Sequence, residues 1–246
     1  MIEFLIIGII DVCFAILLPL FKRNKIVFAF SFLFLCIGTW SIEIYILSAV
    51  KDIALLLPLF HLSRIGLFFI SPAMFFFVYS LVREMSNLKY LLLFSFILSA
   101  SLFIMDNTYF PSQLIVHNQS YMPENNIINM INLLNFGLIG CISSITLLIA
   151  RYNNVAASEK EKIKWITLGF IIAGTLGVIS FKYSKIYALS GNIISLFIIS
   201  YAILKHNLMD IKVFIRRSTV YGLLFIVIMS SFVYAHLNSS DIWVFK

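Results

Sequence analysis

The chain has 246 residues, of which 61% are hydrophobic and 12% are charged, and its formal net charge is +7. A soluble domain carries about twice that share of charged residues, so the composition excludes an ordinary soluble fold. The excess of basic residues does not indicate a nucleic-acid partner, because these residues lie in the loops between apolar stretches.

Eight long apolar stretches follow one another along the chain, separated by short polar loops. About 20 helical residues cross the roughly 30 Å of hydrocarbon in a bilayer. Backbone polar groups in lipid must be satisfied within the segment, which selects helices. We therefore predict an all-α, polytopic membrane protein with seven transmembrane helices and an additional eighth. The predicted segments are residues 2–21, 26–50, 53–82, 90–105, 126–150, 165–181, 186–204 and 218–236.

The basic residues are distributed unevenly among the loops. Thirteen follow the first, third, fifth and seventh segments, namely Lys22, Arg23, Lys25, Arg83, Lys89, Arg151, Lys160, Lys162, Lys164, Lys205, Lys212, Arg216 and Arg217. Three follow the second, fourth and sixth segments, namely Lys51, Lys182 and Lys185. Basic residues near the ends of spans stay in the cytoplasm. We therefore predict a multi-pass protein of the cell membrane, in contact with the lipid bilayer, with its N-terminus outside.

The predicted organisation has three parts. Residues 1–204 form a seven-helix membrane domain, residues 205–217 form a cytoplasmic linker, and residues 218–246 form an eighth transmembrane helix with a short tail. The linker alternates charged and apolar residues, which is typical of an amphipathic segment on the inner membrane surface.

Two loops are longer than the others. Residues 106–125 form the longest external loop of the prediction, and a loop of this length often has a function. In the cytoplasmic loop 151–164, Ser158 and Glu161 form a capping box, which predicts a helix from about Glu159 into the sixth segment. The charges of this helix are either a solvated face or a contact surface for a partner.

Sequence motifs for catalysis are absent. The chain has no phosphate loop, no dinucleotide glycine motif, no HExxH and no kinase signature. Its histidines are dispersed, and its three cysteines lie inside apolar stretches without metal-ligand spacing. We therefore expect no catalytic residues, no metal and no cofactor, and we do not expect the chain to be an enzyme.

Four ionisable residues lie within the apolar segments: Asp11, Glu43, His61 and Arg64. Such residues are expensive in a bilayer and usually mark a functional site. Counted along their helices, all four lie roughly 10–17 Å below the outer surface. Because the second and third segments are consecutive and antiparallel, we predict an ion pair between Glu43 and Arg64.

Amides add to this polar set. Asn129, Asn132 and Asn135 are spaced three apart and therefore lie on one face of the fifth segment, and Asn192 lies in the seventh. Two interpretations are open: the groups bond helix to helix, or they line an outward-opening pocket for a small-molecule or peptide ligand. The predicted ligand-binding residues are Asp11, Glu43, His61, Arg64, Asn129, Asn132, Asn135 and Asn192.

The end of the membrane region resembles a known family. The resemblance rests on a Tyr-Ala-Ile run from Tyr201, a Leu-x-Asp-Ile turn around Asp210, the pair Arg216 and Arg217, and a Tyr-Gly-Leu start at Tyr221. This pattern resembles the juxtamembrane segment of bacterial sensor histidine kinases that have a seven-helix N-terminal region, including quorum-sensing and competence kinases. A weaker match is the stretch from Arg64 to the Ser-Pro-aromatic run that begins at residue 71.

The resemblance implies a sensory input module of a two-component system. Such a module would detect an extracellular or membrane-partitioned ligand and pass a helix rearrangement to a cytoplasmic kinase or response regulator. A second copy of the chain is a further candidate partner. The phosphoacceptor helix and ATP-binding domain of these kinases have no counterpart before Lys246, so no phosphotransfer residue is assigned. The alternative is a small transporter or permease subunit, which would require polar groups through the inner half as well.

Overall fold

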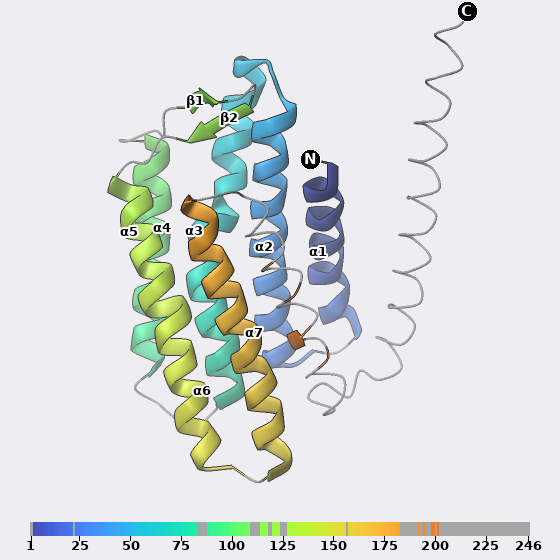
Figure 1. The fold of residues 1–246 in the computed structure, drawn as a ribbon, viewed down its shortest axis with the longest axis vertical. Coiled ribbons are helices and arrows are strands. Elements are labelled where there is room, and N and C mark those ends of the chain that lie inside the picture. The colour runs from blue at the N-terminus through green and yellow to red at the C-terminus, as the bar shows by residue number, and fades with distance from the viewer. Residues whose placement is uncertain are drawn as a thin grey trace, which may run out of the picture.

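The computed structural model describes residues 2–21, 23–82, 88–108, 114–117, 120–123, 127–155 and 157–182, and single positions between 191 and 201. Its first four helices are α1 (Ile2–Phe21), α2 (Lys25–Ala49), α3 (Ile53–Val82) and α4 (Leu88–Thr108). A hairpin of β1 (Leu114–His117) and β2 (Ser120–Pro123) follows. The remaining elements are α5 (Ile127–Asn135), the π-helix η1 (Phe136–Ser143), α6 (Ser144–Asn153) and α7 (Ala157–Lys182) (Figure 1).

Within the described residues, five helices are long and apolar enough to cross a membrane. They are α1, α2, α3, α4 and the continuous helix Ile127–Asn153 that comprises α5, η1 and α6. A helical membrane protein is therefore confirmed. The predicted sixth segment forms the C-terminal part of α7. The predicted seventh segment lies largely outside the described residues, and the linker 205–217 and the eighth segment lie entirely outside them.

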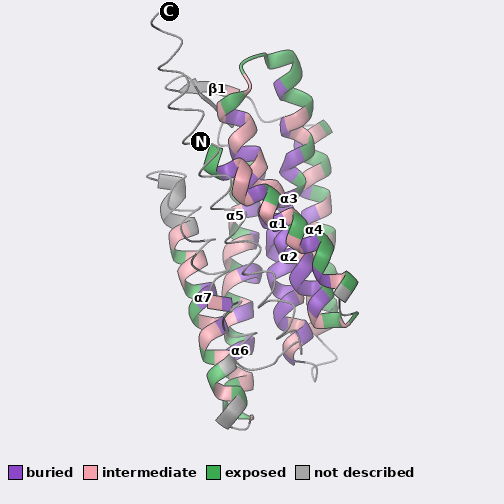
Figure 2. Ribbon diagram, turned by 90° about the vertical axis from the view of Figure 1, so that its right-hand side faces the viewer, coloured by how far each residue is buried: buried purple, intermediate pink, exposed green. Residues whose placement is uncertain are grey.

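The helices α2 and α3 form the centre of the described bundle. In each of them 67% of the most apolar window is buried, against 17% in α4 (Figure 2). Glycines bring the central helices close together. A Cβ on Gly66 of α3 would overlap Thr39 and the backbone of Cys36 and Trp40 in α2. A Cβ on Gly8 of α1 would lie 2.8 Å from the carbonyl oxygen of Gly38.

Two of these helices begin at a polar residue whose side chain bonds to a backbone amide of the first turn. Asn24 is the N-cap of α2, and its side-chain oxygen accepts a hydrogen bond of 2.7 Å from the amide of Val27. The carboxylate of Asp52 accepts a bond of 3.0 Å from the amide of Ala54 at the start of α3. Residues 50–52 alone separate α2 from α3, so these two helices are antiparallel neighbours.

The hairpin occupies much of the region predicted to be one long loop. The helix α4 extends to Thr108, so Asp106 belongs to a helix and not to that loop. In the antiparallel hairpin, Leu114 pairs with Pro123 and His117 with Ser120. Leu114 also packs against a small cluster of Leu47, Leu56 and Phe60, which attaches the hairpin to α2 and α3. We call this end of the molecule the hairpin end.

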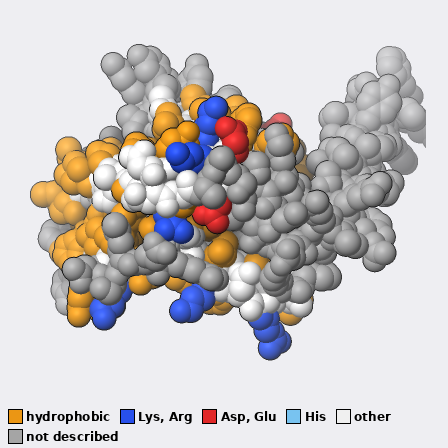
Figure 3. Space-filling model, turned by 90° about the horizontal axis from the view of Figure 1, so that it is seen from below, with side chains coloured by type: hydrophobic (Ala, Val, Ile, Leu, Met, Phe, Trp, Pro, Cys, Tyr) orange, Lys and Arg blue, Asp and Glu red, His pale blue; other side chains and the backbone are white. Residues whose placement is uncertain are grey.

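Basic side chains gather at the opposite end, with acidic side chains among them and apolar side chains beside them (Figure 3). The helix α7 begins at Ala157, two residues before the predicted start, and continues into the sixth predicted segment as expected. Across the turn between α6 and α7, Nη2 of Arg151 lies 4.0 Å from the carboxylate of Glu159. Nζ of Lys160 lies 5.4 Å from the centre of the Tyr152 ring. These contacts connect the two helices at the tip of the bundle.

Candidate functional site: a buried polar seam

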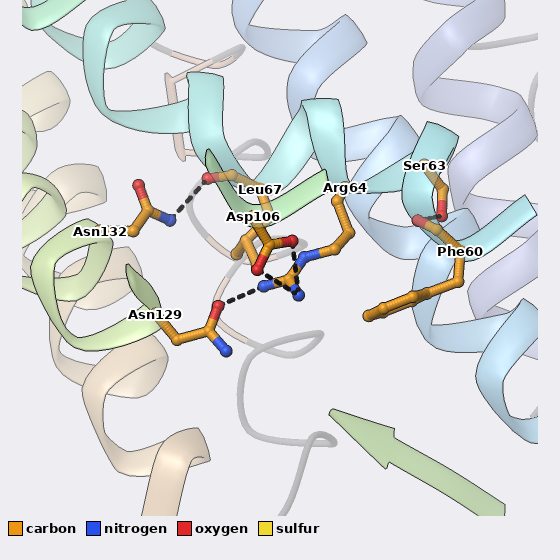
Figure 4. Close-up of polar contacts among 7 residues, drawn as sticks. All are labelled: Phe60, Ser63, Arg64, Leu67, Asp106, Asn129 and Asn132. Atoms are coloured by element: carbon orange, nitrogen blue, oxygen red, sulfur yellow. Dashed lines mark hydrogen bonds and ion pairs between the residues drawn. The ribbon is translucent and has the colours of Figure 1, made fainter. Parts of the chain in front are cut away.

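Arg64 is the centre of a buried ionic cluster at the hairpin end. The side chains of Arg64 and Asp106 are both 0% exposed, and Nη1 lies 3.0 Å from Oδ2 of the carboxylate. The same nitrogen donates a hydrogen bond of 3.3 Å to Oδ1. Nη2 donates to the side-chain oxygen of Asn129 (Figure 4). The cluster therefore connects α3, α4 and α5.

Two aromatic rings of the same helix flank the guanidinium of Arg64. Its central carbon lies 5.0 Å from the ring centre of Phe60 and 5.2 Å from that of Phe68. These residues are four positions before and after Arg64, so all three side chains lie on one face of α3. Ring faces attract cations, and the attraction is larger where water is excluded. The rings and the carboxylate together explain how a permanently charged side chain is buried at this depth.

The asparagines of the fifth predicted segment continue this arrangement along the helix. Nδ2 of Asn132 donates a long bond of 3.4 Å to the carbonyl of Leu67. Nδ2 of Asn135 donates a bond of 3.1 Å to Oγ of Ser99 in α4. The hydroxyl of Ser71 in α3 donates a bond of 3.0 Å to the carbonyl of Asn135. The prediction that the three asparagines share one helix face is confirmed.

We call the set Arg64, Ser71, Ser99, Asp106, Asn129, Asn132 and Asn135 the polar seam. Its charged members lie at the hairpin end, and its neutral members continue toward the middle of the bundle. The helices α3, α4 and α5 all contribute side chains to it. The seam corresponds to the helix-to-helix interpretation of the sequence, because its members bond to one another across helices.

The ion pair predicted between Glu43 and Arg64 stays a prediction, and the carboxylate found 3.0 Å from Arg64 is that of Asp106, a partner that the sequence analysis did not name. The orientation of α3 explains the contact with Asp106. Gly66 faces α2, and a residue two positions away is turned by about 200° around the helix axis. The guanidinium of Arg64 therefore reaches α4 and α5. Glu43 is buried on α2.

The other predicted site residues are dispersed. Asp11 is buried where α1 packs on α2, and a Cβ on Gly38 would lie 3.0 Å from the Cβ of Asp11. His61 is half-buried, with its ring 5.4 Å from that of Phe60. Asn192 lies outside the described residues. Of the predicted set, the structure thus brings together Arg64, Asn129, Asn132 and Asn135.

Asp106 is the functional candidate that sequence reasoning missed. It was assigned to a loop because it follows a shorter apolar segment and carries a charge. The depth of Asp106 in the membrane could nevertheless be found by counting from the loop between α3, which ends at Val82, and α4, which begins at Leu88. Counted from the middle of that loop, Arg64 and Asp106 are equally distant in antiparallel helices, so they lie at the same depth.

Compared with protein-family models, curated proteins and solved structures, the chain matches none of them. Its class is therefore defined by its own features. Five of the described helices can span a bilayer, and one interface between them contains a fully buried ion pair. The chain is a helical membrane protein with several spans.

Proposed function

We propose that the chain is the sensory input module of a bacterial two-component system, with its N-terminus and its hairpin outside the cell. The observation that carries this proposal is the ionic cluster of Arg64, Asp106 and Asn129. It joins three helices at the hairpin end, and one of them continues through η1 and α6 to the α7 turn at the other end. The resemblance of residues 201–224 to sensor kinases supports the same function.

The chemistry of the cluster suits a ligand-dependent equilibrium. A buried ion pair is sensitive to geometry, and each charge becomes costly when its partner is withdrawn. A ligand that offers a competing charge or hydrogen bond would favour a second packing of the three helices and shift the population toward it. Two buried atoms have no hydrogen-bond partner in the described part of the chain. They are Oδ1 of Asn107, which follows Asp106, and Nδ1 of His61, whose ring lies 5.4 Å from that of Phe60. In the second packing they would be candidates for hydrogen bonds to such a ligand.

The transporter alternative would use the same residues differently. A transport path needs polar groups from one surface to the other. In the described seam, the charged residues are confined to the hairpin end, and the remaining members are neutral. This distribution favours a ligand site connected to a moving helix.

The orientation can be tested by labelling with an impermeant thiol reagent on intact cells, in a chain without native cysteines. We expect Asn118→Cys to be labelled and Asn154→Cys to be labelled only after the cells are opened. The reverse pattern would place the hairpin in the cytoplasm and exclude an extracellular ligand for the seam.

The output can be tested with the full chain in its native membrane. We expect it to co-purify with a histidine-kinase catalytic subunit or a response regulator. Replacing Arg64 and Asp106 together by Met and Leu should change the phosphorylation of that partner, measured on phosphate-affinity gels. Asp52→Asn, at the exposed start of α3, is the control and should leave phosphorylation unchanged. Solute uptake by proteoliposomes that requires Arg64, with unchanged phosphorylation, would instead identify a transporter.

A further inference from the structure

The fifth spanning helix of the described bundle contains a π-helical segment. The segment η1 covers eight residues, Phe136–Ser143, between α5 and α6. The hydroxyl of Ser143 donates a bond of 2.9 Å to the carbonyl of Leu138, five residues earlier, which is the spacing of a π-helix. A π-helical turn holds more residues than an α-helical turn. Such segments are frequent at functional sites.

Each half of this spanning helix has its own contacts. Above η1, Asn135 bonds to Ser99 and Ser71 in the polar seam. Below η1, Leu147 and Leu148 are buried in the main apolar core. A Cβ on Gly140 would lie 3.2 Å from Cα of Ser71, so η1 itself packs closely on α3. The π-helical segment accommodates the difference in register between these two sets of contacts.

Gly137 lies in η1 with open space beside it. A Cβ at this position would meet no atom within 4 Å, apart from the glycine's own neighbours. Its removal would therefore create no cavity and break no side-chain contact. Gly137 can be treated as the extra residue of the π-helix.

We propose that η1 is a register switch between the seam half and the α6 half of this helix. Loss of one residue from the π-helical register turns one half relative to the other by about 100° and shifts it by about 1.5 Å. A turn of that size would move all three asparagines away from α3 and α4. Rupture of the seam and relaxation of η1 to an α-helix are therefore coupled. The signalling role of this motion rests on the proposed function, whereas the switch itself does not.

The register can be read by an engineered disulfide between η1 and α7. A Cβ at Gly174 would lie 3.1 Å from Sγ and 3.8 Å from Cβ of Cys141. This matches the usual separation of the two Cβ atoms in a disulfide, about 3.8 Å. The parent chain for the experiment carries Gly174→Cys, with Cys13 and Cys36 replaced by Ala. Mild oxidation in membranes should link residues 141 and 174, as detected by thiol labelling and mass spectrometry.

Deletion of Gly137 in this parent tests whether η1 can absorb one residue. We expect the disulfide to form at close to the parent rate, because the α6 half keeps its position and η1 becomes α-helical. Deletion of both Gly137 and Leu138 is the matched control. Because the proposal assigns one extra residue to η1, this deletion should turn the α6 half or the seam half and abolish the link or the native thermal transition. Loss of the link after the single deletion would overturn the proposal.

Hydrogen exchange distinguishes a switch from a static insertion. In the parent, the backbone amides of residues 136–143 should exchange at least about tenfold faster than the same amides after deletion of Gly137. Equal exchange in the two chains would show that η1 does not open, and would overturn the switch. Neither measurement depends on a ligand or a kinase. A failure here is therefore distinct from a failure of the proposed sensory function.

Discussion

Two interfaces of the same bundle are held together in different ways. Between α1, α2 and α3, glycines at positions 8, 38 and 66 bring the backbones into contact. Between α3, α4 and α5, the polar seam joins the helices through charges and amides. Association in lipid gains little from burying apolar side chains, so close packing and polar bonds are the available means. The first interface should therefore respond to side-chain size and the second to side-chain chemistry.

The largest expected effect is the loss of one charge from the seam. Replacing Arg64 by Met leaves the carboxylate of Asp106 buried without this counterion, and we expect a loss of about 3–5 kcal/mol in unfolding free energy. Unfolding in detergent, followed by thermal scanning, measures the change. Arg23→Met, at an exposed loop position, is the control and should have little effect. A stability loss below about 1 kcal/mol would show that the pair is worth no more than one on the surface.

A slightly smaller effect is expected from a side chain at the glycine interface. In Gly66→Val, the new side chain would overlap the backbone of α2, and overpacking of this kind costs about 1–3 kcal/mol or more. Gly137→Ala is the matched control, because the added methyl group meets open space. That variant should be neutral or up to about 1 kcal/mol more stable, since alanine favours a helix over glycine. Equal destabilisation by both would contradict the difference between the two positions.

Within the seam, the neutral members should matter less than the charges. Asn135→Leu removes the bond to Ser99, and interhelical bonds of this kind contribute about 1–2 kcal/mol. Asn132→Leu should cost less. Its bond to the carbonyl of Leu67 is longer, 3.4 Å against 3.1 Å for the bond of Asn135 to Ser99. Thermal unfolding of the two variants side by side tests this order, and the reverse order would contradict the bonding pattern.

The smallest effect is expected at the tip of the bundle. Glu159→Gln removes a partly exposed contact of 4.0 Å with Arg151. An exposed pair of this kind contributes about 0–1 kcal/mol, and added salt screens what remains. The same thermal assay should show no clear change in stability. A loss comparable to that of Arg64→Met would mean that the turn between α6 and α7 is more important to the fold than the seam.

Much of the described fold was predictable because lipid imposes a strong pattern. The apolar segments gave the first four helices to within a few residues, apart from α4, whose charged end was assigned to a loop. The spacing of three asparagines predicted one polar face. These features depend on neighbouring residues in the sequence, so they can be read without the tertiary structure.

The remaining features depend on how helices are turned relative to one another. Charge and depth in the sequence suggested Glu43 as a partner of Arg64, but the contact of Arg64 with Asp106 follows from the orientation of α3, whose Gly66 faces α2. The π-helical register of η1 follows from contacts with α3, α4 and the core on its two sides, and no local motif specifies it. The hairpin likewise depends on the packing of Leu114 against α2 and α3.

The most direct test of this account is a pair of double-mutant cycles that share Arg64→Met. One cycle combines it with Asp106→Leu and the other with Glu43→Leu, and unfolding free energies are measured for all variants in the same detergent. If Asp106 is the counterion, the first cycle should give a coupling energy of about 2–4 kcal/mol, and the double variant should recover much of the stability lost in each single variant. The second cycle measures the predicted contact of Arg64 with Glu43, and we expect its coupling energy to be the smaller of the two. A large coupling with Glu43 and none with Asp106 would contradict the polar seam.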